Sequence, residues 1–134
     1  MEMEKADLEE RLINYSVQII ELIQSMPNTK AGGHLSGQLL RCGTSFSLNY
    51  GEAKSGESRK DFIHKMQVAL KELRETFVWL KIICRAKLCG SENKMQEALK
   101  ENDELISIFV KSIQTAKKNS KFENRCSLAG IQNE

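Results

Sequence analysis

The chain has 134 residues, the size of one ordinary domain, and can bury a core without disulfides or metals. Its formal net charge of +2 excludes a strong overall attraction to nucleic acid or to membranes. The sequence contains a single proline, which favours long uninterrupted helices over a sheet protein with many turns. We therefore expect one all-α domain.

The first two helices are predicted over residues 6–26 and 29–55. Apolar residues recur at helical spacing from Leu8 to Ile23, with polar residues between them, so the first segment is an amphipathic helix. Pro27 ends it because proline lacks the backbone N–H and restricts the residue before it. Thr29 is a favourable N-cap for the second helix.

The third and fourth helices are predicted over residues 59–89 and 92–118. Ser58 is a good N-cap for the third helix, and Gly90 is expected to mark its end. Ser91 caps the fourth helix, and basic residues suit its end near Lys117. Residues 119–134 lack apolar periodicity, so we expect a flexible tail after a bundle that spans 1–118. Short links between long helices predict an antiparallel up-down-up-down four-helix bundle.

The second predicted helix is rich in small residues. Gly43, Ser47 and Gly51 recur at every fourth position, which indicates close approach by another backbone, with a kinked helix as the alternative. Arg41 and Asn49 lie near one face of the same helix. They form either a recognition pair at a subunit junction or a buried hydrogen-bond network that fixes helix register.

The apolar residues of the predicted bundle exceed what one core needs. We expect Phe46, Trp79 and Ile82 to remain for contact with another subunit, because such residues exposed together on a monomer form an association site. The sequence therefore predicts a homo-oligomer, with Trp79 grouped with the small-residue positions as an interface candidate.

Charge is unevenly distributed along the chain. Residues 1–26 hold six acidic and two basic residues, whereas residues 59–87 hold three acidic and eight basic residues. Basic side chains recur along the third helix at spacings that place them on one stripe: Lys60, His64, Lys71, Arg74, Lys81 and Arg85. Such a stripe could neutralise phosphates of RNA or single-stranded nucleic acid. The alternative is an ordinary solvated face with ion pairs one turn apart.

Two segments resemble the signature of the bacterial four helix bundle protein family, whose founding members are encoded in intervening sequences of 23S rRNA genes. They are Arg-Cys-Gly-Thr-Ser-Phe-Ser-Leu-Asn-Tyr-Gly-Glu-Ala at 41–53 and Ser-Arg-Lys-Asp-Phe-Ile-His-Lys-Met at 58–66. The resemblance implies an antiparallel bundle that assembles as a homopentameric ring. The chain is also similar to the accessory protein of diversity-generating retroelements, which implies nucleic acid and a reverse transcriptase as partners. Neither family brings catalytic residues.

An enzymatic role is not expected. His34 and His64 stand without a nucleophile motif, and Glu52 and Glu57 fall at a helix end where carboxylates are ordinarily exposed. Cys84 and Cys89 lack a paired Cys or His at zinc-ligand spacing, so we expect no metal and no cofactor. The chain has four cysteines: Cys42, Cys84, Cys89 and Cys126.

The location is expected to be cytoplasmic. The chain starts with acidic residues rather than a basic segment before an apolar stretch, and no apolar run could span a bilayer. The cysteines are therefore expected to be free thiols. Two functions remain open: a nucleic-acid-associated adaptor, or a protein-only scaffold that binds another polypeptide.

Overall fold

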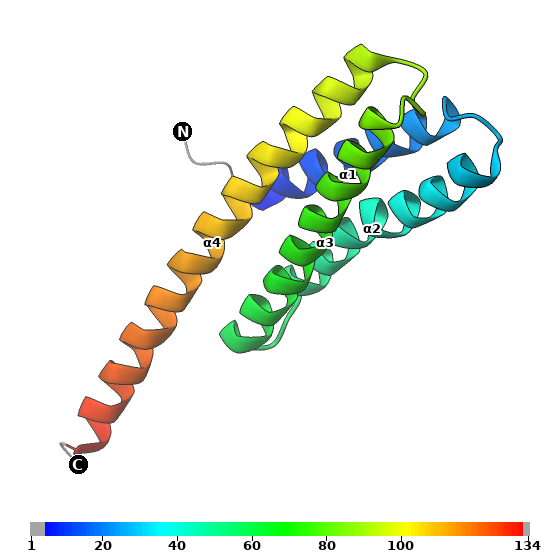
Figure 1. Ribbon diagram of the computed structural model, residues 1–134. Helices are drawn as coiled ribbons and strands as arrows, with labels where there is room; N and C mark the ends of the chain where they lie inside the picture. Colours follow the sequence, from blue (N-terminus) through cyan, green and yellow to red (C-terminus); the bar gives the residue numbers. More distant parts are fainter. Residues whose placement is uncertain (1–4, 133–134) are drawn as a thin grey trace.

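Four helices make up the computed structural model, which describes the backbone of residues 5–132 and the side chains of 7–120 (Figure 1). They are α1 (Lys5–Gln24), α2 (Lys30–Lys54), α3 (Arg59–Arg85) and α4 (Glu92–Gln132). Sequence neighbours pack on one another, and α1 also packs on α4, so the described chain closes into an antiparallel bundle. The predicted all-α four-helix bundle is confirmed.

Side-chain caps begin the two middle helices where the sequence predicts them. The hydroxyl of Thr29 accepts a hydrogen bond from the N–H of Gly32 at 3.0 Å, and the hydroxyl of Ser58 accepts one from Asp61 at 3.1 Å. Both caps satisfy backbone donors that have no partner inside a helix.

The end of α3 differs from the prediction. The helix ends at Arg85 rather than near residue 89, because Lys87 takes the left-handed conformation with φ 57°. The N–H of Lys87 donates to the carbonyl of Cys84 at 3.1 Å, and the N–H of Leu88 donates to that of Ile83 at 3.0 Å. This pair of bonds is a Schellman motif, in which a lysine holds the position that glycine usually fills.

Gly90 therefore has another role than ending the helix. Its N–H donates to the hydroxyl of Ser25 at 3.2 Å, which joins the α3–α4 link to the α1–α2 link. A Cβ at residue 90 would lie 2.9 Å from the Cβ of Ser25, so only glycine permits this close approach.

Helix α4 continues past its expected end. The flexible tail expected over 119–134 is helical as far as Gln132, and residues 133–134 lie outside the described part. No proline interrupts this stretch, and its lack of apolar periodicity fits a helix segment that projects beyond the other three helices (Figure 1).

The core fills the space between all four helices. Its largest fully buried side chains include Tyr15, Phe46 and Phe109. The rings of Tyr15 and Phe46 stack with centroids 5.6 Å apart, an arrangement that contributes about 1 kcal/mol beyond burial. The expectation that Phe46 remains for another subunit was therefore wrong, because the α1–α2 packing covers it. Trp79 is half-buried and packs against the core, whereas Ile82 is exposed.

Candidate nucleic-acid interface

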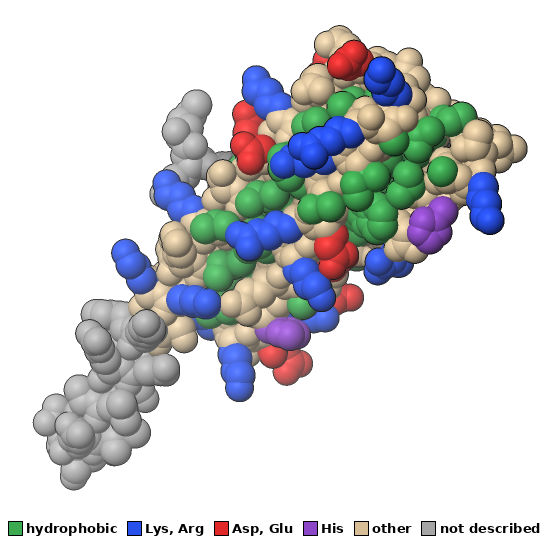
Figure 2. Space-filling model, in the orientation of Figure 1, with side chains coloured by type: hydrophobic (Ala, Val, Ile, Leu, Met, Phe, Trp, Pro, Cys, Tyr) green, Lys and Arg blue, Asp and Glu red, His purple; other side chains and the backbone are tan. Residues whose placement is uncertain are grey.

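The basic residues predicted on the third helix form one surface of α3. Six side chains lie exposed along it, and we call them the basic face of α3: Lys60, His64, Lys71, Arg74, Lys81 and Arg85. At 100° per residue their positions fall within about a third of the helix circumference. Figure 2 shows Lys and Arg side chains spread over the visible face of the bundle, with hydrophobic side chains between them.

None of these six side chains forms an ion pair within the described part of the chain. The Lys81 ammonium lies 4.5 Å from the centre of the Phe77 ring. The neighbouring Lys65 is engaged differently, since its Nζ lies 2.6 Å from Oε2 of Glu52 on α2. The basic face of α3 thus keeps its charge available for an anionic partner.

The small residues of α2 divide between two surfaces. A Cβ at Gly43 would lie 2.9 Å from Cγ2 of Ile19, and Ser16 donates a hydrogen bond to the Gly43 carbonyl at 2.8 Å. The hydroxyls of Ser16 and Ser47 lie 2.8 Å apart. A Cβ at Gly51, however, would meet no described atom within 4 Å. Gly43 and Ser47 thus belong to the α1–α2 packing, and Gly51 faces open space.

Arg41 and Asn49 have separate partners. Arg41 is exposed, and its guanidinium donates to Gln38 at 3.3 Å. The amide of Asn49 donates to the carbonyl of Ser45 at 3.1 Å and to Oε1 of Glu72 at 2.5 Å, which links α2 to α3. Burial raises the pKa of Glu72, and the nearby Glu75 charge raises it further.

A buried polar pair joins α1 to α4. The amide of Asn102 donates to the hydroxyl of Tyr15 at 2.8 Å, while Oδ1 of Asn102 has no hydrogen-bond partner among the described residues. Sequence reasoning missed the hydrogen-bonded pair of Tyr15 and Asn102, although Asn102 occupies an otherwise apolar position between Ala98 and Leu105.

The thiol of Cys42 on α2 is also buried, and this burial raises its pKa.

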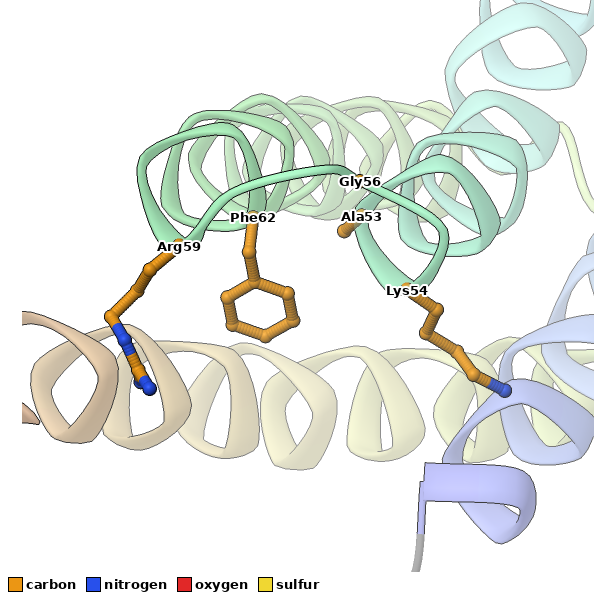
Figure 3. Close-up of a pocket in the computed structure, with 5 residues that line it drawn as sticks. All are labelled: Ala53, Lys54, Gly56, Arg59 and Phe62. Carbon is orange, nitrogen blue, oxygen red and sulfur yellow. The ribbon is translucent and has the colours of Figure 1, made fainter.

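An open pocket of about 260 Å³ lies where α2 passes into α3. Lys54 and Arg59 flank it, and the ring of Phe62 points into the space toward α4 (Figure 3). Nζ of Lys54 lies 2.6 Å from Oε2 of Glu9, so part of the pocket's charge is already paired. The basic face of α3 is therefore the better candidate for binding a polyanion.

Among the described residues, no group of three or more His, Cys, Asp or Glu side chains could hold a metal ion. None of the helices in the described part of the chain carries an apolar stretch that would span a bilayer. Cys42, Cys84 and Cys89 are free, and Cys126 lies outside the described side chains.

Comparison with known proteins agrees with the resemblance seen in the sequence. The family model for 23S rRNA-intervening sequence proteins matches residues 4–111. The chain belongs to this family. This chain is similar to a Bacteroides thetaiotaomicron protein of unknown function from the S23 ribosomal protein family. The crystal structure of that protein superposes on this chain with a TM-score of 0.76, and the two sequences are 28% identical. The match covers 84% of this chain and 99% of that chain. No curated protein matches the chain.

Proposed function

We propose that this member of the 23S rRNA-intervening sequence protein family is a non-enzymatic, oligomeric adaptor that binds RNA or single-stranded nucleic acid. The observation that carries the proposal is the basic face of α3, with six exposed cationic or titratable side chains and no ion pair among them within the described part. Each lysine or arginine that neutralises a phosphate releases counterions, which gives affinity without sequence preference.

Assembly would multiply this modest surface. The family resemblance suggests a homopentamer, which we place in the cytoplasm. Several copies of the basic face of α3 would bind one strand more tightly than a single copy. The similarity to the retroelement accessory protein makes a reverse transcriptase a candidate protein partner.

A protein-only scaffold is the second candidate. It is favoured by Val78 and Ile82, which are 55% and 42% exposed in the middle of the basic face of α3. Apolar residues at these positions suit a polypeptide partner better than a phosphate backbone.

Filter binding to polyuridine and to an oligo(dT) strand at low salt tests the adaptor proposal. Lys60→Glu combined with Lys71→Glu should weaken binding and lower the slope of log affinity against log salt by about 1.4, since each phosphate contact on a single strand contributes about 0.7. Lys94→Glu with Lys100→Glu is the matched control, because both lysines are exposed on α4 and the charge change is identical. Equal affinity of the two double variants would rule out the basic face of α3 as the binding surface.

A further inference from the structure

Two helices of the bundle each expose a pair of β-branched residues one turn apart. Ile13 and Val17 on α1 are 43% and 46% exposed, and Val78 and Ile82 on α3 are 55% and 42% exposed. Residues four apart lie beside each other on a helix, so each pair forms a continuous apolar strip. Neither strip contributes to the buried core.

Charges of opposite sign bracket the two strips. Glu10 and Glu21 flank the pair on α1, whereas Arg74 and Arg85 flank the pair on α3. All four charged side chains are exposed, and none has an ion-pair partner within the described part of the chain. Each set covers less than a quarter of its helix circumference, at 100° per residue.

The spacing of the two sets is the same when one is read backwards. On α1 the residues Glu10, Ile13, Val17 and Glu21 are separated by three, four and four positions. On α3 the residues Arg74, Val78, Ile82 and Arg85 are separated by four, four and three. Two antiparallel helices bring such reversed sets face to face, so each glutamate meets an arginine and each apolar residue meets another.

One molecule cannot make this contact with itself. Among the described residues α1 packs on α2 and α4 but not on α3, so α1 and α3 occupy diagonal positions of the bundle. We propose that α1 of one copy packs antiparallel against α3 of a second copy, with Glu10 near Arg85 and Glu21 near Arg74. The two surfaces differ, so the contact is heterologous and can repeat from copy to copy.

This assignment divides the basic face of α3 into two parts. Arg74 and Arg85 belong to the contact between copies, and Lys81 lies between them in the sequence. Lys60, His64 and Lys71 lie nearer the start of α3 and stay open to other partners. The contact between copies does not depend on nucleic acid. The Lys60 and Lys71 variants therefore test the proposed function without changing any residue of that contact.

Light scattering coupled to size exclusion, at micromolar concentration without nucleic acid, tests the contact. The wild-type chain should exceed the 15.2 kDa of one copy. Ile13→Asp with Val17→Asp, and separately Val78→Asp with Ile82→Asp, should each give a monomer with unchanged helical circular dichroism. An equimolar mixture of the two double variants should give a species of twice 15.2 kDa, because one α3 strip and one α1 strip remain intact.

The mixture separates a heterologous contact from a symmetric one. A contact of α1 with α1, or of α3 with α3, would leave one double variant dimeric on its own, and that result would overturn the proposal. A monomeric wild-type chain or a monomeric mixture would also overturn it. Leu40→Asp with Leu48→Asp is the matched control on α2, where these residues are 42% and 70% exposed, and it should leave the mass unchanged. If this control variant were instead monomeric, the contact between copies would involve α2, and the proposal would be wrong.

A charge swap gives an independent test. Glu21→Arg or Arg74→Glu alone should weaken assembly by at least about two- to fivefold, because each removes one exposed ion pair and sets like charges opposite each other. The chain that carries both substitutions should recover wild-type affinity, because opposite charges again face each other across the contact. Additive weakening in the double variant would show that these residues do not meet.

Discussion

The close approach of α1 and α2 at Gly43 leads to a prediction about two glycines of the same helix. Gly43→Ala would place a methyl group 2.9 Å from Cγ2 and 3.0 Å from Cδ1 of Ile19, whereas Gly37→Ala would meet nothing within 4 Å. Contacts between carbon atoms are normally about 3.5–4.0 Å. The first substitution therefore forces Ile19 or the helix backbone to move, and the second does not.

The magnitudes follow from two opposing effects. Alanine in place of glycine inside a helix contributes about 1 kcal/mol of stability. Overpacking of a fully buried site such as Ile19 costs about 1–3 kcal/mol. We expect Gly37→Ala to gain about 1 kcal/mol and Gly43→Ala to lie between about zero and a loss of 2 kcal/mol.

Urea unfolding followed by helical circular dichroism measures both variants. A cycle with Ile19→Ala locates the cause, since removing the Ile19 side chain should let Gly43→Ala stabilise that background as Gly37→Ala does in the wild type. If Gly43→Ala raises the free energy of unfolding of the wild-type chain as much as Gly37→Ala, the close approach has no energetic role and the reasoning fails.

Three further predictions concern polar and backbone features. Tyr15→Phe should cost about 1–3 kcal/mol in urea unfolding because it strands the buried Asn102 amide, and adding Asn102→Leu should recover most of that loss. Burial raises the pKa of Glu72 above its ordinary 4.5, so the folded state binds the Glu72 proton more tightly than the unfolded state does. The contribution of Glu72 to stability therefore falls as the pH rises through that raised pKa. Glu72→Gln should accordingly exceed the wild-type melting temperature at neutral pH and lose this advantage below about pH 4.5, and an advantage that persists in acid would contradict the assignment. Lys87→Gly should stabilise α3 by up to about 1 kcal/mol by relieving the left-handed conformation, and a lower melting temperature would contradict this.

The number, order and approximate bounds of the helices were predictable because apolar periodicity and capping residues are local signals. The end of α3 was not, since the usual preference for glycine pointed to Gly90 while the chain reverses at Lys87. The residue at which α3 ends depends on how the link after it packs against the rest of the bundle. In this chain Gly90 contacts Ser25 of the α1–α2 link and so lies beyond the end of the helix.

The candidate site was predictable in part. Exposure of the basic face of α3 follows from helical spacing, and the structure brings its residues onto one surface. Phe46 was misplaced because a helical pattern does not show which apolar residue a neighbouring helix covers. The partners of Asn49 and Asn102 lie 23 and 87 residues away, so only the packed bundle could pair them.

The seam between α1 and α4 has a consequence for the order of folding. Arg11 of α1 pairs with Glu101 and Glu104 of α4, contacts that join residues 90 and 93 positions apart. The α1–α2, α2–α3 and α3–α4 hairpins all close through short links, whereas this seam must close most of the chain. We therefore expect the α1–α4 seam to form after the three hairpins and to open before them, an order that amide hydrogen exchange along α1 and α4 would test.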